Sequence, residues 1–196
     1  MSMYHEGNLE LQARFSTVAL ADRLVEKLTH DRFNDGDKDM IESCGFFFLA
    51  TADSEGRPDC SYKGGAAGFV RVLAPDLLVY PDYDGNGMFK SLGNVQANPR
   101  VGMLFIAMGE KPKRLRVNGT AELSFDDPLL AQFPGGQLLV RVTPEHIFPN
   151  CPRYIHNLQM IEPSIYVPEK GCAPVEPAWK SFADFKDVVP SRKPTA

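Results

Sequence analysis

The strongest constraint on the fold is a series of short apolar segments, separated by dense turn signals, between residues 46 and 142. Segments of this length with Gly, Pro, Asn and Asp between them are typical of antiparallel strands joined by hairpins. About seven such strands predict a small closed β-barrel. The predicted strands cover residues 46–52, 57–62, 69–73, 77–80, 101–106, 115–122 and 138–142.

Helical patterns flank these strands. Ser16 and Thr17 precede apolar residues at i, i+3, i+4 and i+7 spacing over 21–28, which predicts an N-capped helix. A second short helix is expected over 37–44, with Asp37 as its cap. The many prolines from Pro144 onward favour extended segments rather than further strands.

The resulting fold class is mainly β with flanking helices, an α+β arrangement. Residues 1–45 form a helical lead, residues 46–148 form the barrel core, and residues 149–196 wrap around it as part of the same domain. A chain of 196 residues is long enough to bury such a core without a disulfide or a metal.

Composition excludes several classes of function. The formal net charge of −4 disfavours a broad nucleic-acid surface, which needs clustered positive charge. The longest apolar run, 101–108, is far shorter than the roughly 20 residues of a membrane helix. The N-terminus lacks a basic and apolar leader, and the four cysteines form no Cys-x-x-Cys pair. We therefore expect a cytoplasmic protein without a membrane span, a nucleic-acid partner or a metal site.

A candidate anion site lies where the glycine-containing segment 84–87 runs into a predicted helix over 87–98. Free backbone N–H groups at a helix start attract anions, and Lys90 and Ser91 fall in the first turn. The alternative is an Asn-Gly turn in which Asn86 only caps the chain. Positive residues on the predicted strands favour the anion site; these are Lys63, Arg71, Arg114 and Arg116.

Two further segments are candidate ligand contacts. The glycine-rich stretch 63–68 precedes a strand instead of opening a helix, which disfavours a dinucleotide fingerprint, but it lets a flat ligand approach the backbone. The segment 150–156 holds Cys151, Arg153, Tyr154 and His156 without any hydrolytic triad order. Each segment also has a simpler interpretation, as a connection or as a buried cysteine beside exposed polar residues.

Several motifs follow one another in a fixed order between residues 47 and 123. They are Phe48-Leu49-Ala50-Thr51-Ala52 with Gly56-Arg57-Pro58, Gly68-Phe69-Val70-Arg71-Val72-Leu73, Leu78-Val79-Tyr80-Pro81-Asp82-Tyr83, a helix that ends in Ala97-Asn98-Pro99, and Arg114-Leu115-Arg116-Val117-Asn118-Gly119. This combination resembles the FMN-binding split-barrel superfamily related to pyridoxamine 5'-phosphate oxidase. The segments 59–65, 81–88 and 150–154 resemble its subgroup of predicted flavin-nucleotide-binding proteins.

The resemblance implies an antiparallel Greek-key split barrel that binds FMN non-covalently, in a homodimer with the flavin at the subunit interface. It implies a flavin-dependent oxidoreductase with a small-molecule substrate, and it identifies no catalytic residue. The implied cofactor contacts are Ser61, Tyr62, Lys63, Arg71, Tyr80, Pro81, Asp82, Asn86, Lys90, Ser91 and Arg114. The substrate side is predicted at Cys151, Arg153 and Tyr154.

Two alternatives keep the same barrel. One is a haem- or flavin-binding protein without turnover, in which haem would need an axial ligand from His146, His156 or Cys151. The other is a reductase that uses the deazaflavin F420, as some split-barrel relatives do.

Overall fold

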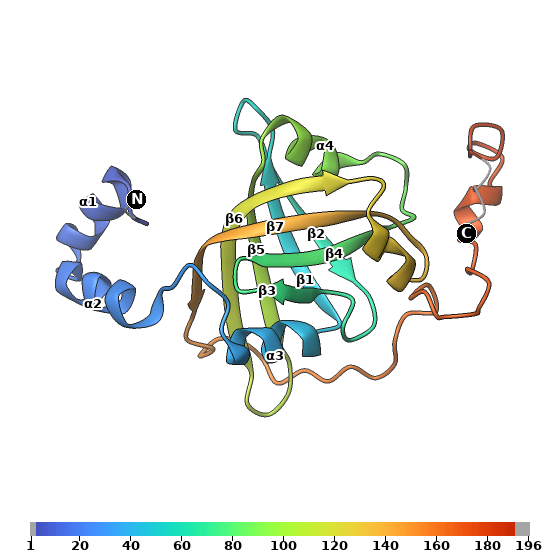
Figure 1. The fold of residues 1–196 in the computed structure, drawn as a ribbon. Helices are drawn as coiled ribbons and strands as arrows, with labels where there is room; N and C mark the ends of the chain where they lie inside the picture. Colours follow the sequence, from blue (N-terminus) through green and yellow to red (C-terminus); the bar gives the residue numbers. More distant parts are fainter. Residues whose placement is uncertain (1–2, 191–196) are drawn as a thin grey trace.

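A single seven-stranded antiparallel sheet dominates the computed structural model, which describes residues 3–190 (Figure 1). The order of strands in the sheet is β2-β1-β5-β6-β7-β4-β3. The mixed α+β class and the predicted strands are confirmed. The strands are β1 (Phe46–Ala52), β2 (Pro58–Gly64), β3 (Arg71–Ala74), β4 (Leu77–Tyr83), β5 (Arg100–Ala107), β6 (Lys113–Ser124) and β7 (Gly136–Pro149).

The sheet curls on itself so that its inner face becomes the core. Phe47 of β1 packs edge-on against Tyr80 of β4, with 5.0 Å between ring centroids, although three strands separate β1 from β4 in the sheet. Phe105 of β5 lies 5.2 Å from the same Phe47 ring. All three side chains are fully buried. Burial of such large apolar groups is the main force that closes the sheet.

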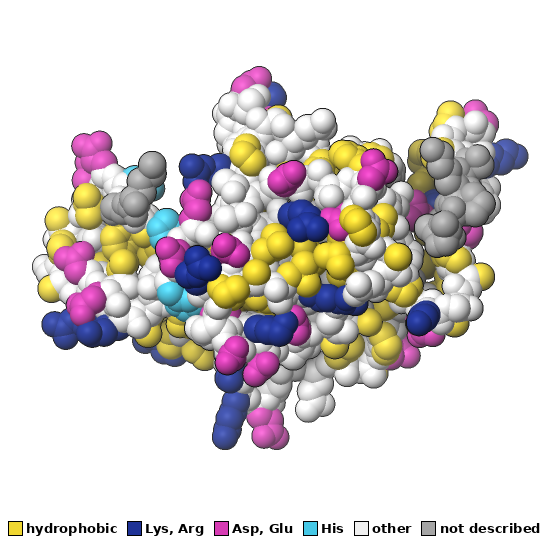
Figure 2. Space-filling model, in the orientation of Figure 1, with side chains coloured by type: hydrophobic (Ala, Val, Ile, Leu, Met, Phe, Trp, Pro, Cys, Tyr) yellow, Lys and Arg dark blue, Asp and Glu magenta, His cyan; other side chains and the backbone are white. Residues whose placement is uncertain are grey.

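Four α-helices accompany the sheet within residues 3–190, and two of them stand apart from it. Helices α1 (Glu6–Arg14) and α2 (Val18–Leu28) form an arm at one side of the barrel (Figure 1). Helix α1 buries no residue and α2 buries only Ala21. Hydrophobic side chains are therefore visible on the surface of the arm (Figure 2).

The helical lead differs from the sequence prediction in two ways. Helix α1 was not expected, because its sequence has no clear apolar stripe; it is separated from α2 at Ser16, whose φ is 55°. Helix α3 (Asp35–Ser43) begins before Asp37, because Asn34 is its N-cap and accepts the N–H of Asp37 at 3.0 Å. Asp37 in turn accepts the N–H of Asn34 through its carboxylate, which completes a capping box.

Strand β7 continues through Pro144, where the sequence predicted an extended wrapping segment. The register between β6 and β7 shifts at Gly119, which pairs with Pro144, and a bulge there tolerates the missing N–H of proline. A Cβ on Gly119 would lie 2.1 Å from the carbonyl oxygen of Thr143, so only glycine fits this position.

The barrel has two distinct ends along β5. Helix α4 (Lys90–Ala97) leads into β5 at Arg100 and lies at the same end as the turn between β1 and β2 (Figure 1). Helix α3 lies at the opposite end, beside the β5–β6 hairpin (Figure 1). We refer to these as the α4 end and the α3 end. No helix among residues 3–190 is long and apolar enough to cross a membrane.

Candidate functional site

Polar side chains of β2 and α4 meet at the α4 end. The Ser91 hydroxyl donates to the Asp59 carboxylate at 3.2 Å, and the hydroxyls of Ser61 and Ser91 lie 2.9 Å apart. Asp59 and Ser61 are two positions apart on β2, so their side chains lie on the same side of the strand. The buried Leu49, which pairs with Ser61 from β1, projects from that side too. The docking of the first turn of α4 against this row explains why Ser91 is buried.

The N-terminus of α4 carries no side-chain cap among the described residues. Its N-cap residue, Phe89, has a left-handed conformation with φ 47°, and this is why the helix begins at Lys90 rather than at residue 87. Met88, which falls inside the predicted helix over 87–98, lies before the observed helix and is exposed. Asn86 accepts the N–H of Met88 at 3.0 Å and thus stabilises the loop, not the helix. The exposed Lys90 is the first residue of the helix.

Lys63 continues the same row of β2 and interacts with Asp82 near the end of β4. Burial raises the pKa of Asp82, the positive charge of Lys63 opposes that shift, and the negative charge of Asp84 adds to it. The net result is a raised pKa for the Asp82 carboxyl. Lys63 pairs with Phe47 at the start of β1, so it lies along β2 away from the β1–β2 turn, near an acidic group that partly balances its charge.

Arg71 turns toward the 3₁₀ helix η1 (Pro128–Gln132) in the single chain. Its Nη1 donates to Oε1 of Gln132 at 2.8 Å, and its guanidinium lies 4.2 Å from the ring centroid of Phe133. Its Nε donates to the carbonyl of Gly68 at 3.2 Å. The predicted strand cation is thus held away from Ser91 by contacts that its own sequence neighbourhood does not reveal.

Two of the predicted contacts on β4 are buried on opposite faces of the strand, Tyr80 inside the barrel and Pro81 on the face that η1 covers. Tyr80 is fully buried, burial raises the pKa of its hydroxyl, and the hydroxyl has no hydrogen-bond partner among the described residues. Pro81 is also buried. Tyr62 has the opposite environment, because 62% of its surface is exposed and its ring stacks on Phe46 at 5.3 Å.

Arg114 lies at the α3 end. Its Nη2 donates to the carbonyl of Cys151 at 2.9 Å, while its Nε is buried without a partner among residues 3–190. The backbone N–H of Asn150 donates to the carbonyl of Arg114 at 3.1 Å. The side chains of Cys151, Arg153 and Tyr154 are exposed. Arg114 and the predicted substrate segment are thus brought together.

The predicted site residues therefore fall into two groups. Ser61, Lys90 and Ser91 gather at the α4 end, whereas Lys63 lies two residues beyond Ser61 along β2, toward the start of β1. Arg114 pairs with Ile106 near the opposite end of β5, so it does not reach that group within one chain. Sequence reasoning missed Asp59 as a site residue, although its alternation with Ser61 and Lys63 on a strand is a usable signal.

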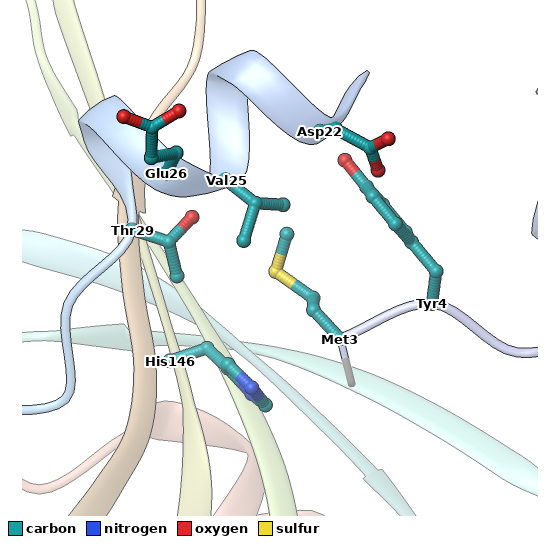
Figure 3. Close-up of a pocket in the computed structure, with 7 residues that line it drawn as sticks. All are labelled: Met3, Tyr4, Asp22, Val25, Glu26, Thr29 and His146. Atoms are coloured by element: carbon teal, nitrogen blue, oxygen red, sulfur yellow. The ribbon is translucent and has the colours of Figure 1, made fainter. Parts of the chain in front are cut away.

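The candidate haem ligands do not converge either. His146 lines a cavity of about 350 Å³ beneath α2, together with Met3 and Val25 (Figure 3). His156 and Cys151 are exposed in the segment after β7. Within residues 3–190, no three His, Cys, Asp or Glu side chains are placed to hold a metal ion.

The curled antiparallel sheet, with helices at both ends and a polar helix start beside β2, defines a split-barrel protein. Residues 33–154 match the family model described as pyridoxamine 5'-phosphate oxidase. The match spans more than half of the chain, so the protein belongs to the pyridoxamine 5'-phosphate oxidase family. No match was found among curated proteins.

Solved structures give further similarities. HupZ from Group A Streptococcus is 19% identical, with a TM-score of 0.47 over 60% of this chain and 93% of that one. HutZ, the haem storage protein from Vibrio cholerae, is also 19% identical, with a TM-score of 0.44 over 60% and 95%. An FMN-binding protein from Syntrophomonas wolfei is 14% identical, with a TM-score of 0.42 over 73% and 97%.

Proposed function

We propose that this protein is an FMN-dependent oxidoreductase that binds the flavin non-covalently at the α4 end, between two copies of the chain. The observation that carries the proposal is the uncapped start of α4, with Lys90 in its first turn and two hydroxyls beside it, in a member of the pyridoxamine 5'-phosphate oxidase family. The hydroxyls belong to Ser61 and Ser91, and Lys63, two residues beyond Ser61 on β2, is the proposed second cation.

This donor set fits a phosphate group. The first N–H groups of α4 and the positive end of its dipole favour an anion, and the Lys90 ammonium adds charge. Ser91 lies in the first turn, and Ser61 is within hydrogen-bond distance of it. Charge-assisted hydrogen bonds from such groups are about twice as strong as neutral ones. The bound isoalloxazine would supply the redox chemistry, and the chain would bind and orient it.

The second copy is part of the same proposal. Phe46, Phe48 and Tyr62 pack together on the outer face of β1 and β2, with ring centroids 5.3 to 5.9 Å apart. Tyr62 remains largely exposed in the single chain. An exposed aromatic cluster of this kind marks an interaction surface, and a symmetric dimer would cover it with its own copy.

The remaining predicted contacts have more limited roles. The backbone at Tyr80, Pro81 and Asp82 is proposed to lie against the flavin ring, because the side chains of Tyr80 and Pro81 are buried. Arg71 would bind the flavin phosphate only after it gives up its hydrogen bond to Gln132. The exposed Cys151, Arg153 and Tyr154 stay as the proposed substrate side.

The test is flavin content and affinity. We expect the purified protein to be yellow, to release flavin on denaturation and to rebind FMN with quenching of its fluorescence. Replacement of both Lys63 and Lys90 by Ala should lower the affinity for FMN at least about tenfold, because two charged donors are lost. The matched control replaces Lys170 and Lys186, two exposed lysines of the C-terminal segment, and should leave the affinity unchanged.

Three results would contradict the proposal. One is a colourless protein that takes up no FMN. Another is tighter binding of F420 than of FMN in parallel titrations. The third is a Soret band on haem addition that is lost in His156→Ala. Enzymatic turnover is tested separately, by anaerobic reduction of the bound flavin with NADH or NADPH and reoxidation with a panel of oxidants.

A further inference from the structure

A cavity of about 540 Å³ lies at the α3 end, between the linker that joins α2 to α3 and the ends of β6 and β7. Its volume falls within the range of about 300–1,000 Å³ that small-molecule sites occupy. The residues around it are mostly apolar on one side, including Leu28, Met40 and Leu115. Polar and charged residues complete the wall. Of these, the family resemblance gives a role only to Arg114, as a flavin contact, and the flavin proposal above does not use it.

The polar wall carries an excess of positive charge. Lys27, Lys113 and Arg114 line the cavity, and Asp37 is its only acidic lining residue within the described part of the chain. Lys27 pairs with Glu26 at 2.6 Å, so the excess charge comes from Lys113 and Arg114. Arg114 is half-buried there, so its charge is less screened than that of a surface arginine. A site with this charge and an apolar side suits a small organic anion with an apolar body.

Two buried polar atoms at the cavity have no partner among residues 3–190. They are Nε of Arg114, a donor, and Oδ1 of Asn150, an acceptor. A buried polar atom that makes no hydrogen bond costs about 1–3 kcal/mol. An anionic oxygen would satisfy the first atom, and a hydroxyl or amino group on the same ligand would satisfy the second.

A histidine is fixed in the same wall. Nε2 of His30 lies 2.6 Å from Oδ2 of the buried Asp37, and the same oxygen also accepts the N–H of Asn34. The backbone of His30 exchanges two hydrogen bonds with Ile147 of β7, at 3.0 and 2.7 Å. With Nε2 donating to Asp37, the other ring nitrogen, Nδ1, has no partner among the described residues.

We propose that this cavity binds a small organic anion that has an apolar body and a hydroxyl or amino group next to its acidic group, with Arg114 as the anion contact and His30 as a second polar contact. The site is separate from the proposed flavin phosphate site, because Arg114 and α4 lie at opposite ends of β5. Binding at the cavity therefore requires neither FMN nor a dimer.

The probe is mandelate, which has a phenyl ring, a carboxylate and a neighbouring hydroxyl. Its neutral amide, mandelamide, is the matched ligand control. We expect mandelate to bind the flavin-free protein at least about tenfold more tightly than mandelamide, as measured by calorimetry. In ¹⁵N-histidine spectra of the unmutated protein, mandelate should shift the His30 ring signal, which the His30→Gln variant identifies. This spectrum does not depend on the folding of an Arg114 variant.

The variant test compares two arginines of β6. Arg114→Met should lower the affinity for mandelate about tenfold or more. Arg116→Met, which changes an exposed arginine of the same strand, should leave that affinity unchanged. Equal affinity for mandelate and mandelamide, an unshifted His30 signal, or an equal loss in both arginine variants would overturn the proposal. Unchanged FMN affinity in the Lys63 and Lys90 variant, with mandelate bound as expected, would contradict only the flavin site.

Discussion

The two ends of the barrel place polar groups in different ways. At the α4 end, the side chains of Ser91, Asn94 and Thr51 are buried, and each makes a hydrogen bond within the chain. At the α3 end, Arg114 and Asn150 each keep a buried polar atom that bonds to nothing in the described residues. The first arrangement stabilises the fold and offers its N–H groups at the surface, whereas the second leaves hydrogen-bonding capacity for a ligand.

The largest effect on stability is expected from Asp37 at the α3 end. Its carboxylate closes the capping box of α3 and holds His30, so Asp37→Ala should lower the free energy of unfolding by about 2 kcal/mol. Asp37→Asn keeps an oxygen acceptor for the N–H of Asn34, so its free energy of unfolding should fall by less. Urea denaturation of both variants measures the difference, and equal midpoints would contradict the role of the cap.

A smaller effect is expected at the α4 end. The Asn94 amide donates to the buried hydroxyl of Thr51 at 3.0 Å. Asn94→Ala should cost about 1 kcal/mol, because the Thr51 hydroxyl then remains buried without a partner. Combination with Thr51→Val should recover part of that loss in thermal unfolding. A strictly additive double variant would show that the two residues are not coupled.

The smallest effect is a pH dependence that comes from Asp82. Its folded pKa is raised above the unfolded value, so the stability it contributes is present at low pH and is lost as pH rises through the folded pKa. As the pH rises from about 4 to about 7, Asp82→Asn should therefore become more stable relative to the parent protein. Lys63→Met removes the charge that opposes this shift, so the pH dependence should grow. Melting curves at both pH values measure it, and a smaller dependence in Lys63→Met would be the contrary result.

Much of the fold follows from local sequence. Short apolar runs and turn residues predict the strands within a few positions, and the conflict at Pro144 arises because a bulge opposite Gly119 is a property of the paired strand. Helix α1 lacks an apolar stripe that would identify it. The late start of α4 depends on the left-handed Phe89, and a large side chain rarely adopts that conformation.

The candidate site is predicted less completely, because long-range packing decides which charges meet. Ser61, Lys63 and Ser91 are all predicted contacts, and the structure places the hydroxyls of Ser61 and Ser91 2.9 Å apart. Arg71 has a sequence context typical of a phosphate contact, yet Gln132, 61 positions away, holds it. His30 carries no motif, and only its contact with Asp37 distinguishes it.

The two backbone bonds between His30 and Ile147 have a consequence for limited proteolysis. They join the chain to β7 directly after α2, where the arm meets the barrel. We expect a cut near Ser16 to leave Lys27, Leu28 and His30 in place as one wall of the cavity. The Tyr4 hydroxyl, which donates to the carbonyl of Ala21 at 3.4 Å, still links the segment before α1 to α2. The α3 end should therefore stay intact in the nicked protein.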